Sequence, residues 1–122
     1  MTTEAVILVG TSENREMIDL LFEAGFAPIV RRKMEQVLRT LQRGRFAAVV
    51  VDGEHVEDDL LEFVLNVSDV AAGMPLVVAG GERDEQDNAR LSSRKNVHLV
   101  QPEEFCRRLE EIVSRTSGEK QN

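Results

Sequence analysis

Residues 46–52 of the chain read FAAVVVD, an apolar and β-branched run that ends in a carboxylate. Two further runs of this kind are AVILV at residues 5–9, followed by Gly10-Thr11, and VHLV at residues 97–100, followed by Gln101-Pro102. Strands that are apolar on both faces are typical of parallel sheets with helices on either side. The sequence therefore predicts a covered parallel sheet, and it draws attention to the residues at which these strands end.

Helical segments are expected between the strands. The predicted strands are residues 5–9, 28–31, 46–51, 75–79 and 97–100. Between the first four, apolar residues recur at helical spacing and are followed by Gly25, Gly44 or Gly73, and glycine commonly ends helices. The apolar residues of these three helices are Met17, Ile18, Leu20, Leu21 and Phe22, then Met34, Val37, Leu38 and Leu41, then Leu60, Leu61, Phe63, Val64, Leu65 and Val67.

The last two helices differ in the strength of their patterns. Residues 80–96 offer only Ala89 and Leu91 to a core, so the fourth helix is expected to be short, displaced or mobile. Residues 102–115 are expected to form the closing helix, with Phe105, Leu109, Ile112 and Val113 facing inward. Residues 116–122 are expected to be a polar, frayed tail.

Five strands that alternate with helices predict the α/β class. At 122 residues the natural architecture is one flavodoxin-like, doubly wound (βα)5 domain, a three-layer sandwich with the parallel sheet order 2-1-3-4-5. This domain is expected to span residues 1–115, with the polar tail after it. A functional site in such a fold lies at the carboxyl ends of strands 1 and 3.

Composition and charge exclude several classes of function. A net charge of −7, together with no Trp or Tyr, argues against binding to nucleic acid or anionic lipid. No apolar run approaches the roughly 20 residues that span a bilayer, so a cytoplasmic protein is expected. Cys106 is the only cysteine and is interpreted as a reduced core thiol. Two histidines and one cysteine supply neither a metal cluster nor a nucleophile–base pair, so an independent enzyme is not expected.

The charges are distributed unevenly along the chain. Residues 31–45 carry Arg31, Arg32, Lys33, Arg39, Arg43 and Arg45 against Glu35 alone, a local charge of +5. Just beyond them lies an acidic stretch, which consists of Asp52, Glu54, Glu57, Asp58, Asp59 and Glu62. Two interpretations stay open for the basic segment: a solvated helix face, or a docking patch for an acidic partner.

Over residues 4–115 the chain resembles response-regulator receiver domains of the CheY-like superfamily. Asp52 stands at the position of the phosphorylated aspartate, at the end of the third strand. His98 stands at a position that is often aromatic in the family and that changes rotamer with signalling. Pro102 follows the fifth strand, as in the Lys-Pro pair of the family.

The other site positions depart from the family pattern. Gly10 and Thr11 replace two acidic residues that hold magnesium, and Gln101 replaces the Lys that pairs with the phosphoryl group. Glu54 stands where a backbone carbonyl binds the metal, and Ala79 replaces the Ser or Thr that follows the phosphoryl group. Phosphoryl transfer depends on cations that stabilise spreading negative charge. These replacements are therefore expected to disfavour magnesium-dependent phosphorylation of Asp52.

The resemblance implies an atypical receiver, or pseudo-receiver: a signalling module without a cofactor that acts by protein–protein interaction in a two-component or transcriptional regulatory pathway. Its partners would be a sensor kinase, a regulator or an output domain, with no direct contact to nucleic acid or membrane. Receivers often bind partners, or a second copy, through the fourth helix, fifth strand and fifth helix. That face would present His98, Arg94, Lys95, Arg107 and Arg108.

Two other functions stay open. The first is a response regulator that accepts a phosphoryl group at Asp52 with the help of magnesium. The second is a small flavodoxin-like protein that binds an anion or another ligand at residues 10–14, Gly-Thr-Ser-Glu-Asn, at a helix N-terminus. Structural roles are also open: Asp52 as the N-terminal cap of the next segment, His98 as a partly exposed strand residue, and Gly80-Gly81 as a flexible turn.

Overall fold

The computed structural model describes residues 4–10, 15–56, 59–81 and 83–120, with residues 115–120 described as backbone only. The strands are β1 (Glu4–Val9), β2 (Phe26–Arg31), β3 (Ala48–Asp52), β4 (Leu76–Ala79) and β5 (Val97–Val100). The helices are α1 (Arg15–Glu23), α2 (Met34–Arg43), α3 (Leu60–Val70), α4 (Glu85–Ser92), the short 3-10 helix η1 (Pro102–Glu104) and α5 (Phe105–Lys120). All strands pair in parallel in the order β2-β1-β3-β4-β5, which confirms the predicted flavodoxin-like fold.

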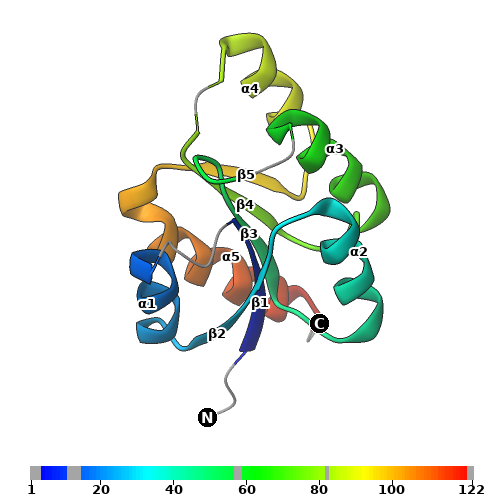
Figure 1. The fold of residues 1–122 in the computed structure, drawn as a ribbon. Coiled ribbons are helices and arrows are strands. Elements are labelled where there is room, and N and C mark those ends of the chain that lie inside the picture. Colours follow the sequence, from blue (N-terminus) through cyan, green and yellow to red (C-terminus); the bar gives the residue numbers. More distant parts are fainter. Residues whose placement is uncertain (1–3, 11–14, 57–58, 82, 121–122) are drawn as a thin grey trace.

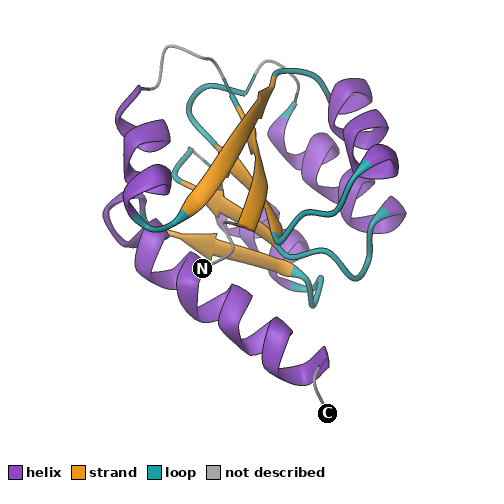
Figure 2. Cartoon of the chain, turned by 90° about the horizontal axis from the view of Figure 1, so that it is seen from below, coloured by secondary structure: helices purple, strands orange, loops and turns teal. Residues whose placement is uncertain are grey.

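The sheet lies between two layers of helices. Figure 1 shows α1 and α5 on one side of the strands and α2 and α3 on the other, and Figure 2 shows the strands between helices from a perpendicular direction. Alternate residues of the strands face the two layers, so that Leu8 packs with Leu21 and Leu109, whereas Ile7 packs with Phe63 and Leu91. The central strands are therefore buried on both faces, as their unbroken apolar sequence predicts.

The boundaries of all strands except β5 differ from the expected ones by one or two residues. β2 begins at Phe26 instead of residue 28, because Phe26 pairs with Glu4 at the start of β1 and is buried. β3 begins at Ala48, two residues later than expected, although the Ala47 amide still donates to the carbonyl of Ala5 at 2.8 Å. Periodicity alone does not mark these ends, because the register with the neighbouring strand decides them.

Several expectations for the helices are corrected. In α1, Met17 and Leu21 are buried, whereas Leu20 and Phe22 are exposed, because one helix can turn only one stripe toward the sheet. In α4 only Leu91 is buried, and Ala89 is exposed.

Helix ends also differ from the expected positions. α3 ends at Val70, with the amide of Ala71 donating to Val67, so Gly73 lies beyond its end. α5 continues to Lys120, so the closing helix extends beyond the expected end at residue 115 into the segment predicted as a polar tail. α4, with 8 residues, is as short as expected, and the inward residues of α5 from Phe105 to Val113 are buried as expected.

The topology places the candidate site at the point where the chain reverses direction across the sheet. After β1 the chain builds the edge strand β2, and it then returns to the other side of β1 to form β3. The carboxyl ends of β1 and β3 therefore lie next to each other with crossover helices on opposite faces, which is where such folds bind ligands. Gly10 and Asp52 stand at these two ends.

Candidate functional site around Asp52

Asp52 lies at the centre of a group of strand ends. Its neighbour in β4 is Ala79, which is buried like Asp52 itself. On its other side, a Cβ atom built on Gly10 would lie 3.1 Å from the Cβ of Asp52 and 3.6 Å from its Oδ2. Gly10, Asp52 and Ala79 thus meet at one edge of the sheet, and Thr11 lies outside the described residues.

The carboxylate of Asp52 is engaged within its own turn. Its Oδ2 lies 2.7 Å from Nδ1 of His55, and its Oδ1 accepts a hydrogen bond from the Glu54 amide at 3.3 Å. A hydrogen on Nδ1 makes the short contact a hydrogen bond to the carboxylate. The amide of His55 also donates to the carbonyl of Asp52, which closes the turn. Asp52 is only 4% exposed, and each of its carboxylate oxygens has a hydrogen-bonding partner within this turn.

His55 was not expected from the sequence, where it was counted only as one of two histidines. Its side chain is 46% exposed, so the imidazole covers the carboxylate while remaining in contact with solvent. The signal for this contact is local: a histidine three residues after a strand-end aspartate reaches back to it when a tight turn joins the two. Sequence reasoning missed this contact because it considered Asp52 as a phosphoacceptor position or as the cap of the next segment, and gave His55 no role.

The helix cap itself is a different residue. Asp59 caps α3 by accepting a hydrogen bond from the amide of Glu62 at 2.9 Å. Asp52 instead stabilises the turn of residues 52–55, which precedes that helix. The expectation that Asp52 caps the next segment is thus correct for a turn and wrong for a helix.

Glycine residues hold the next loop against this turn. A Cβ on Gly53 would lie 2.3 Å from the carbonyl oxygen of Gly80, so only glycine allows the two backbones to approach this closely. Gly80 and Gly81 adopt φ values of +74° and +93°, which favour glycine. Arg83 anchors the same loop by donating to Gly80 O at 2.6 Å and to Asn88 Oδ1 at 2.8 Å. The Gly80-Gly81 turn thus has a defined packing role, which the sequence did not indicate.

Burial and nearby charge affect two further groups. Burial lowers the pKa of the Arg83 guanidinium, and Asp87 opposes this effect by stabilising the charged form. Burial raises the pKa of the Cys106 thiol, and the carboxylates of Glu110 and Glu23 raise it further. Cys106 is therefore a protonated thiol near neutral pH, which agrees with its interpretation as a partly buried core residue.

A pocket of about 470 Å³ opens beside Asp52. Its lining comes from α1, the end of β3 and the turn after it, the end of β4, η1 and the start of α5. It consists of Glu16, Met17, Leu20, Asp52, Glu54, His55, Ala79, Pro102, Glu103, Phe105 and Cys106. Four of these residues are carboxylates, and no Lys or Arg belongs to the lining that the structure describes. The pocket is therefore unfavourable for an anion, including a phosphoryl group.

The described residues offer little to a metal ion. Within the described ranges, no group of three or more His, Cys, Asp or Glu side chains is placed to hold one. Magnesium usually binds through one or two carboxylates together with the substrate phosphate. Of the positions that resemble the receiver pattern and are described, Asp52 alone supplies a carboxylate at the strand ends, because Gly10 has no side chain.

Gln101 and His98 occupy different places on β5 and beyond it. Gln101 is exposed at the N-terminus of η1, where its carbonyl accepts from the amide of Glu104, and it is not part of the described pocket lining. His98 pairs with Val77 and, by the alternation along β5, lies on the face covered by α1 and α5. Its partial exposure agrees with the expectation of a partly exposed strand residue.

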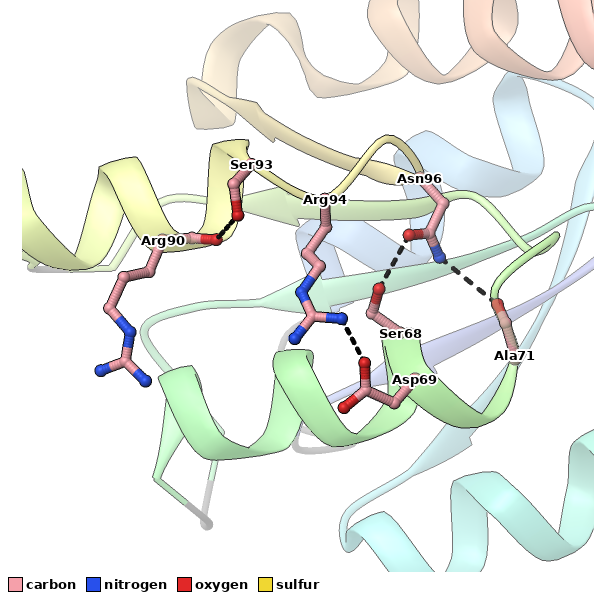
Figure 3. A network of polar contacts seen from close by, with 7 residues as sticks. All are labelled: Ser68, Asp69, Ala71, Arg90, Ser93, Arg94 and Asn96. Atoms are coloured by element: carbon pink, nitrogen blue, oxygen red, sulfur yellow. Dashed lines mark hydrogen bonds and ion pairs between the residues drawn. The ribbon is translucent and has the colours of Figure 1, made fainter.

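Most of the cations expected on the partner face are paired with carboxylates of this chain. Arg94 forms an ion pair with Asp69 of α3, as Figure 3 shows. Arg107 lies 3.5 Å from Glu104 and 3.6 Å from Glu111, and Arg108 donates to Glu111 at 2.9 Å. Lys95 is exposed. This face therefore carries mixed charge rather than a basic patch.

Comparison with known proteins supports the fold. No protein-family profile matches the chain, and no curated protein matches it. Among solved structures, the signal receiver domain of an HD domain-containing protein from Pseudomonas fluorescens Pf-5 superposes with a TM-score of 0.80 at 14% identity, covering 100% of this chain and 96% of that one. The receiver domain of a signal transduction histidine kinase from Syntrophus aciditrophicus gives 0.72 at 18% identity, with 98% and 94% covered.

The chemotaxis response regulator CheY4 of Vibrio cholerae is also similar, with a TM-score of 0.70 at 18% identity, covering 91% of this chain and 99% of that one. At such low identities the similarity concerns the backbone arrangement. No helix among the described residues is long and apolar enough to cross a membrane. The chain thus has the flavodoxin-like fold found in response-regulator receiver domains.

Proposed function

We propose that this chain is a pseudo-receiver, a signalling module that acts by binding proteins in a two-component or transcriptional regulatory pathway. The receiver-like fold supports the signalling role. The observation that favours a pseudo-receiver is the state of Asp52, whose Oδ2 is held by His55 inside a pocket lined by four carboxylates. Such a module works without a resident cofactor or enzymatic activity, in the cytoplasm.

Phosphorylation is disfavoured for two physical reasons. The attacking carboxylate has to be approached by a phosphodonor whose negative charge meets Glu16, Glu54 and Glu103 rather than a cation. The family's Lys is Gln101 here, so the charge-assisted contact to the phosphoryl group is lost, and such contacts are roughly twice as strong as neutral ones. Ala79 also has no hydroxyl to report a modification of Asp52.

The direct test is treatment with magnesium and acetyl phosphate or beryllofluoride, followed by intact mass and amide chemical shifts. We expect no saturable mass gain and no shift pattern that depends on Asp52, with Asp52→Asn as the matched control. A triple variant with Gly10→Asp, Thr11→Asp and Gln101→Lys restores the family's charges and serves as a positive control. A response of the unmodified chain that disappears in Asp52→Asn would establish a phosphoryl-accepting response regulator instead.

The proposed partner is a sensor kinase, a regulator or an output domain, and a second copy of the chain is a further candidate. The proposed surface is formed by α4, β5 and α5. Because Arg107 and Arg108 share Glu111, replacing Glu111 by Gln removes the carboxylate partner of Arg108 and leaves Arg107 beside Glu104. Sedimentation velocity of the Glu111→Gln variant beside the unmodified chain tests whether these charges control self-association.

A further inference from the structure

The structure contains a second pocket, which shares no lining residue with the Asp52 pocket and is opposite to it in charge. It has a volume of about 620 Å³ and lies between the end of β2 and α2. Its lining consists of Val30, Arg31, Arg32, Gln36, Arg39, Thr40, Arg43, Gly44 and Phe46, and is called the α2 groove below. Four of these residues are arginines and none is acidic. The groove is therefore a concentrated positive site on a chain of net charge −7.

Arg31 is held in a fixed orientation within the α2 groove. Its Nε donates to Oγ1 of Thr40 at 3.0 Å, and its Nη1 donates to the carbonyl of Val30 at 2.8 Å. The hydroxyl of Thr40 in turn donates to the carbonyl of Gln36 at 2.7 Å, which fixes the direction of its lone pairs. Because a guanidinium has five N–H donors, Arg31 keeps donors for a ligand while its plane is already ordered.

The loop into α2 is ordered by the same residues. Oε1 of Gln36 accepts from the amides of Arg32 and Lys33 at 3.1 Å and 3.2 Å. At the other end of the helix, the ring of Phe46 lies against Gly44, where a Cβ would approach it at 3.2 Å. The α2 groove thus combines an ordered cationic wall with an apolar part formed by Val30 and Phe46.

Arg39 and Arg43 stand one helical turn apart and point to the same side of α2, because residues at i and i+4 share a helix face. Both are exposed, and neither forms an ion pair within the part of the chain that the structure describes. The helix dipole favours Arg43 in the last turn of α2. The dipole gives no reason for placing Arg31 and Arg32 in the same groove, where like charges repel each other.

We propose that the α2 groove binds an acidic segment of a partner protein, with the carboxylates of Asp or Glu paired to the arginines. Arginine suits carboxylates because its fork can donate two parallel hydrogen bonds to them. Outside residues 31–45, whose charge is +5, the chain carries the remaining −12 of its net −7. A long polyanion such as DNA, or an anionic membrane, would also contact the rest of the surface, whose negative charge repels it. A short acidic segment contacts the groove alone.

The apolar part of the groove favours a peptide over an inorganic ion. Val30 and Phe46 give an apolar side chain of the segment a place beside the arginines, and a free phosphate would leave this surface unused. The inference shares with the proposed function that the partner is a protein. It uses a different surface and does not involve Asp52, so either proposal can fail while the other stands.

The test measures fluorescence anisotropy of a labelled glutamate-rich peptide with one central leucine, titrated with the full chain at low salt. The same peptide with glutamines in place of glutamates is the ligand control. We expect saturable binding of the glutamate peptide that weakens as salt is added, and no saturable binding of the glutamine peptide. The Arg39→Gln/Arg43→Gln double variant is expected to bind about tenfold more weakly or worse, because two charge-assisted contacts are lost.

Matched variants separate the α2 groove from the overall charge of the protein. Arg15→Gln/Arg90→Gln changes the net charge by the same amount at exposed positions outside the groove, and it is expected to leave the affinity within about twofold. Thr40→Val, which releases Nε of Arg31, is expected to weaken binding severalfold, and Thr40→Ser is expected to restore it. Thermal melts of each variant confirm that it is folded.

Three outcomes would overturn the assignment. The first is no saturable binding of the glutamate peptide at low salt. The second is an equal loss in the Arg15/Arg90 control pair, which would show an effect of overall charge alone. The third is tighter binding of inorganic phosphate or of a double-stranded DNA oligonucleotide with the same dependence on Arg39 and Arg43, which would assign the groove to those anions.

Discussion

The carboxylate of Asp52 forms hydrogen bonds with two groups of its own turn, the imidazole of His55 and the amide of Glu54. This arrangement explains how a buried carboxylate is stabilised at strand ends where Gln101 replaces the Lys of the receiver pattern. A buried carboxylate without donors costs several kcal/mol, and hydrogen bonds to a charged group offset about 1.5–3 kcal/mol each. The missing cations of the receiver pattern therefore do not leave an unstable site, because the turn itself supplies donors.

Introducing a second carboxylate beside Asp52 tests this balance. Gly10→Asp places a like charge next to the buried Asp52, since a Cβ at Gly10 lies 3.6 Å from its Oδ2. We expect Gly10→Asp to lower the free energy of unfolding by about 1–3 kcal/mol more than Gly10→Asn, which has the same shape without the charge. Urea unfolding at neutral pH measures the difference, which reports charge because both variants add a side chain to the same backbone.

Magnesium supplies an independent readout of the same pair. A divalent ion neutralises two adjacent carboxylates, so added magnesium is expected to restore part of the stability of Gly10→Asp and none of that of Gly10→Asn. Equal unfolding free energies for the two variants, with or without magnesium, would show that Asp52 does not sense a charge at position 10.

The sequence located this site but not its chemistry. Gly10, Asp52 and Ala79 could be placed together because parallel strand ends share one edge of a sheet. The contact between His55 and Asp52 depends on the backbone path of a turn, and the close approach of Gly53 to Gly80 depends on how two loops meet. Neither has a periodic signature. The α2 groove was predictable in part: its charges are visible in the sequence, whereas the hydrogen bond by which Thr40 orders Arg31 is not.

The connection between α4 and β5 shows how one polar side chain organises several elements. Asn96 accepts from Oγ of the buried Ser68 in α3 at 2.8 Å, and its Nδ2 donates to the carbonyls of Met74 at 2.9 Å and Ala71 at 3.3 Å, as Figure 3 shows in part. It thereby joins the end of α3, the turn before β4 and the start of β5. This network ties the connection after α4 to α3 and to the turn before β4.

Asn96→Ala is expected to destabilise the protein by about 1–3 kcal/mol, because it leaves the Ser68 hydroxyl, which is 3% exposed, without this partner. The matched control is Ser93→Ala, which removes an exposed hydroxyl that donates to the carbonyl of Arg90 and is expected to cost less than about 0.5 kcal/mol. Chemical unfolding of both variants tests the difference. Similar costs for the two would mean that the Asn96 contacts are replaced by water.

The order and type of the elements followed from hydrophobic periodicity, whereas their ends did not. The strand over residues 97–100 was predicted with its observed bounds, because the polar residues Asn96 and Gln101 on either side mark both of its ends. β2 began earlier than expected since pairing with β1 extends it to Phe26. Ala89 was assigned to the core from its apolar character alone. Yet α4 buries Leu91, and residues two apart on a helix point to different faces, so Ala89 is exposed.

The two apolar cores belong to one folding unit, because they share the central strands. One core contains Leu21 of α1 and the other contains Phe63 of α3, and β1, β3 and β4 contribute residues to both. Successive residues of each strand face opposite cores, so neither core can lose its strands without exposing the other. The helices on both sides therefore depend on the same sheet, which is expected to fold and unfold as a single unit.

Replacing a buried side chain by alanine on either side of the sheet is accordingly expected to destabilise the whole molecule. Leu21→Ala should cost about 2–5 kcal/mol and Phe63→Ala about 3–5 kcal/mol, since both side chains are fully buried. Each variant should show one urea transition with an unchanged m-value, by far-ultraviolet circular dichroism and by hydrogen exchange of amides in β1 and β3. If Leu21→Ala instead exposed the amides near α1 and α5 while those facing α2 and α3 stayed protected, the two helical layers would be separate folding units, and the shared sheet would not join them into one.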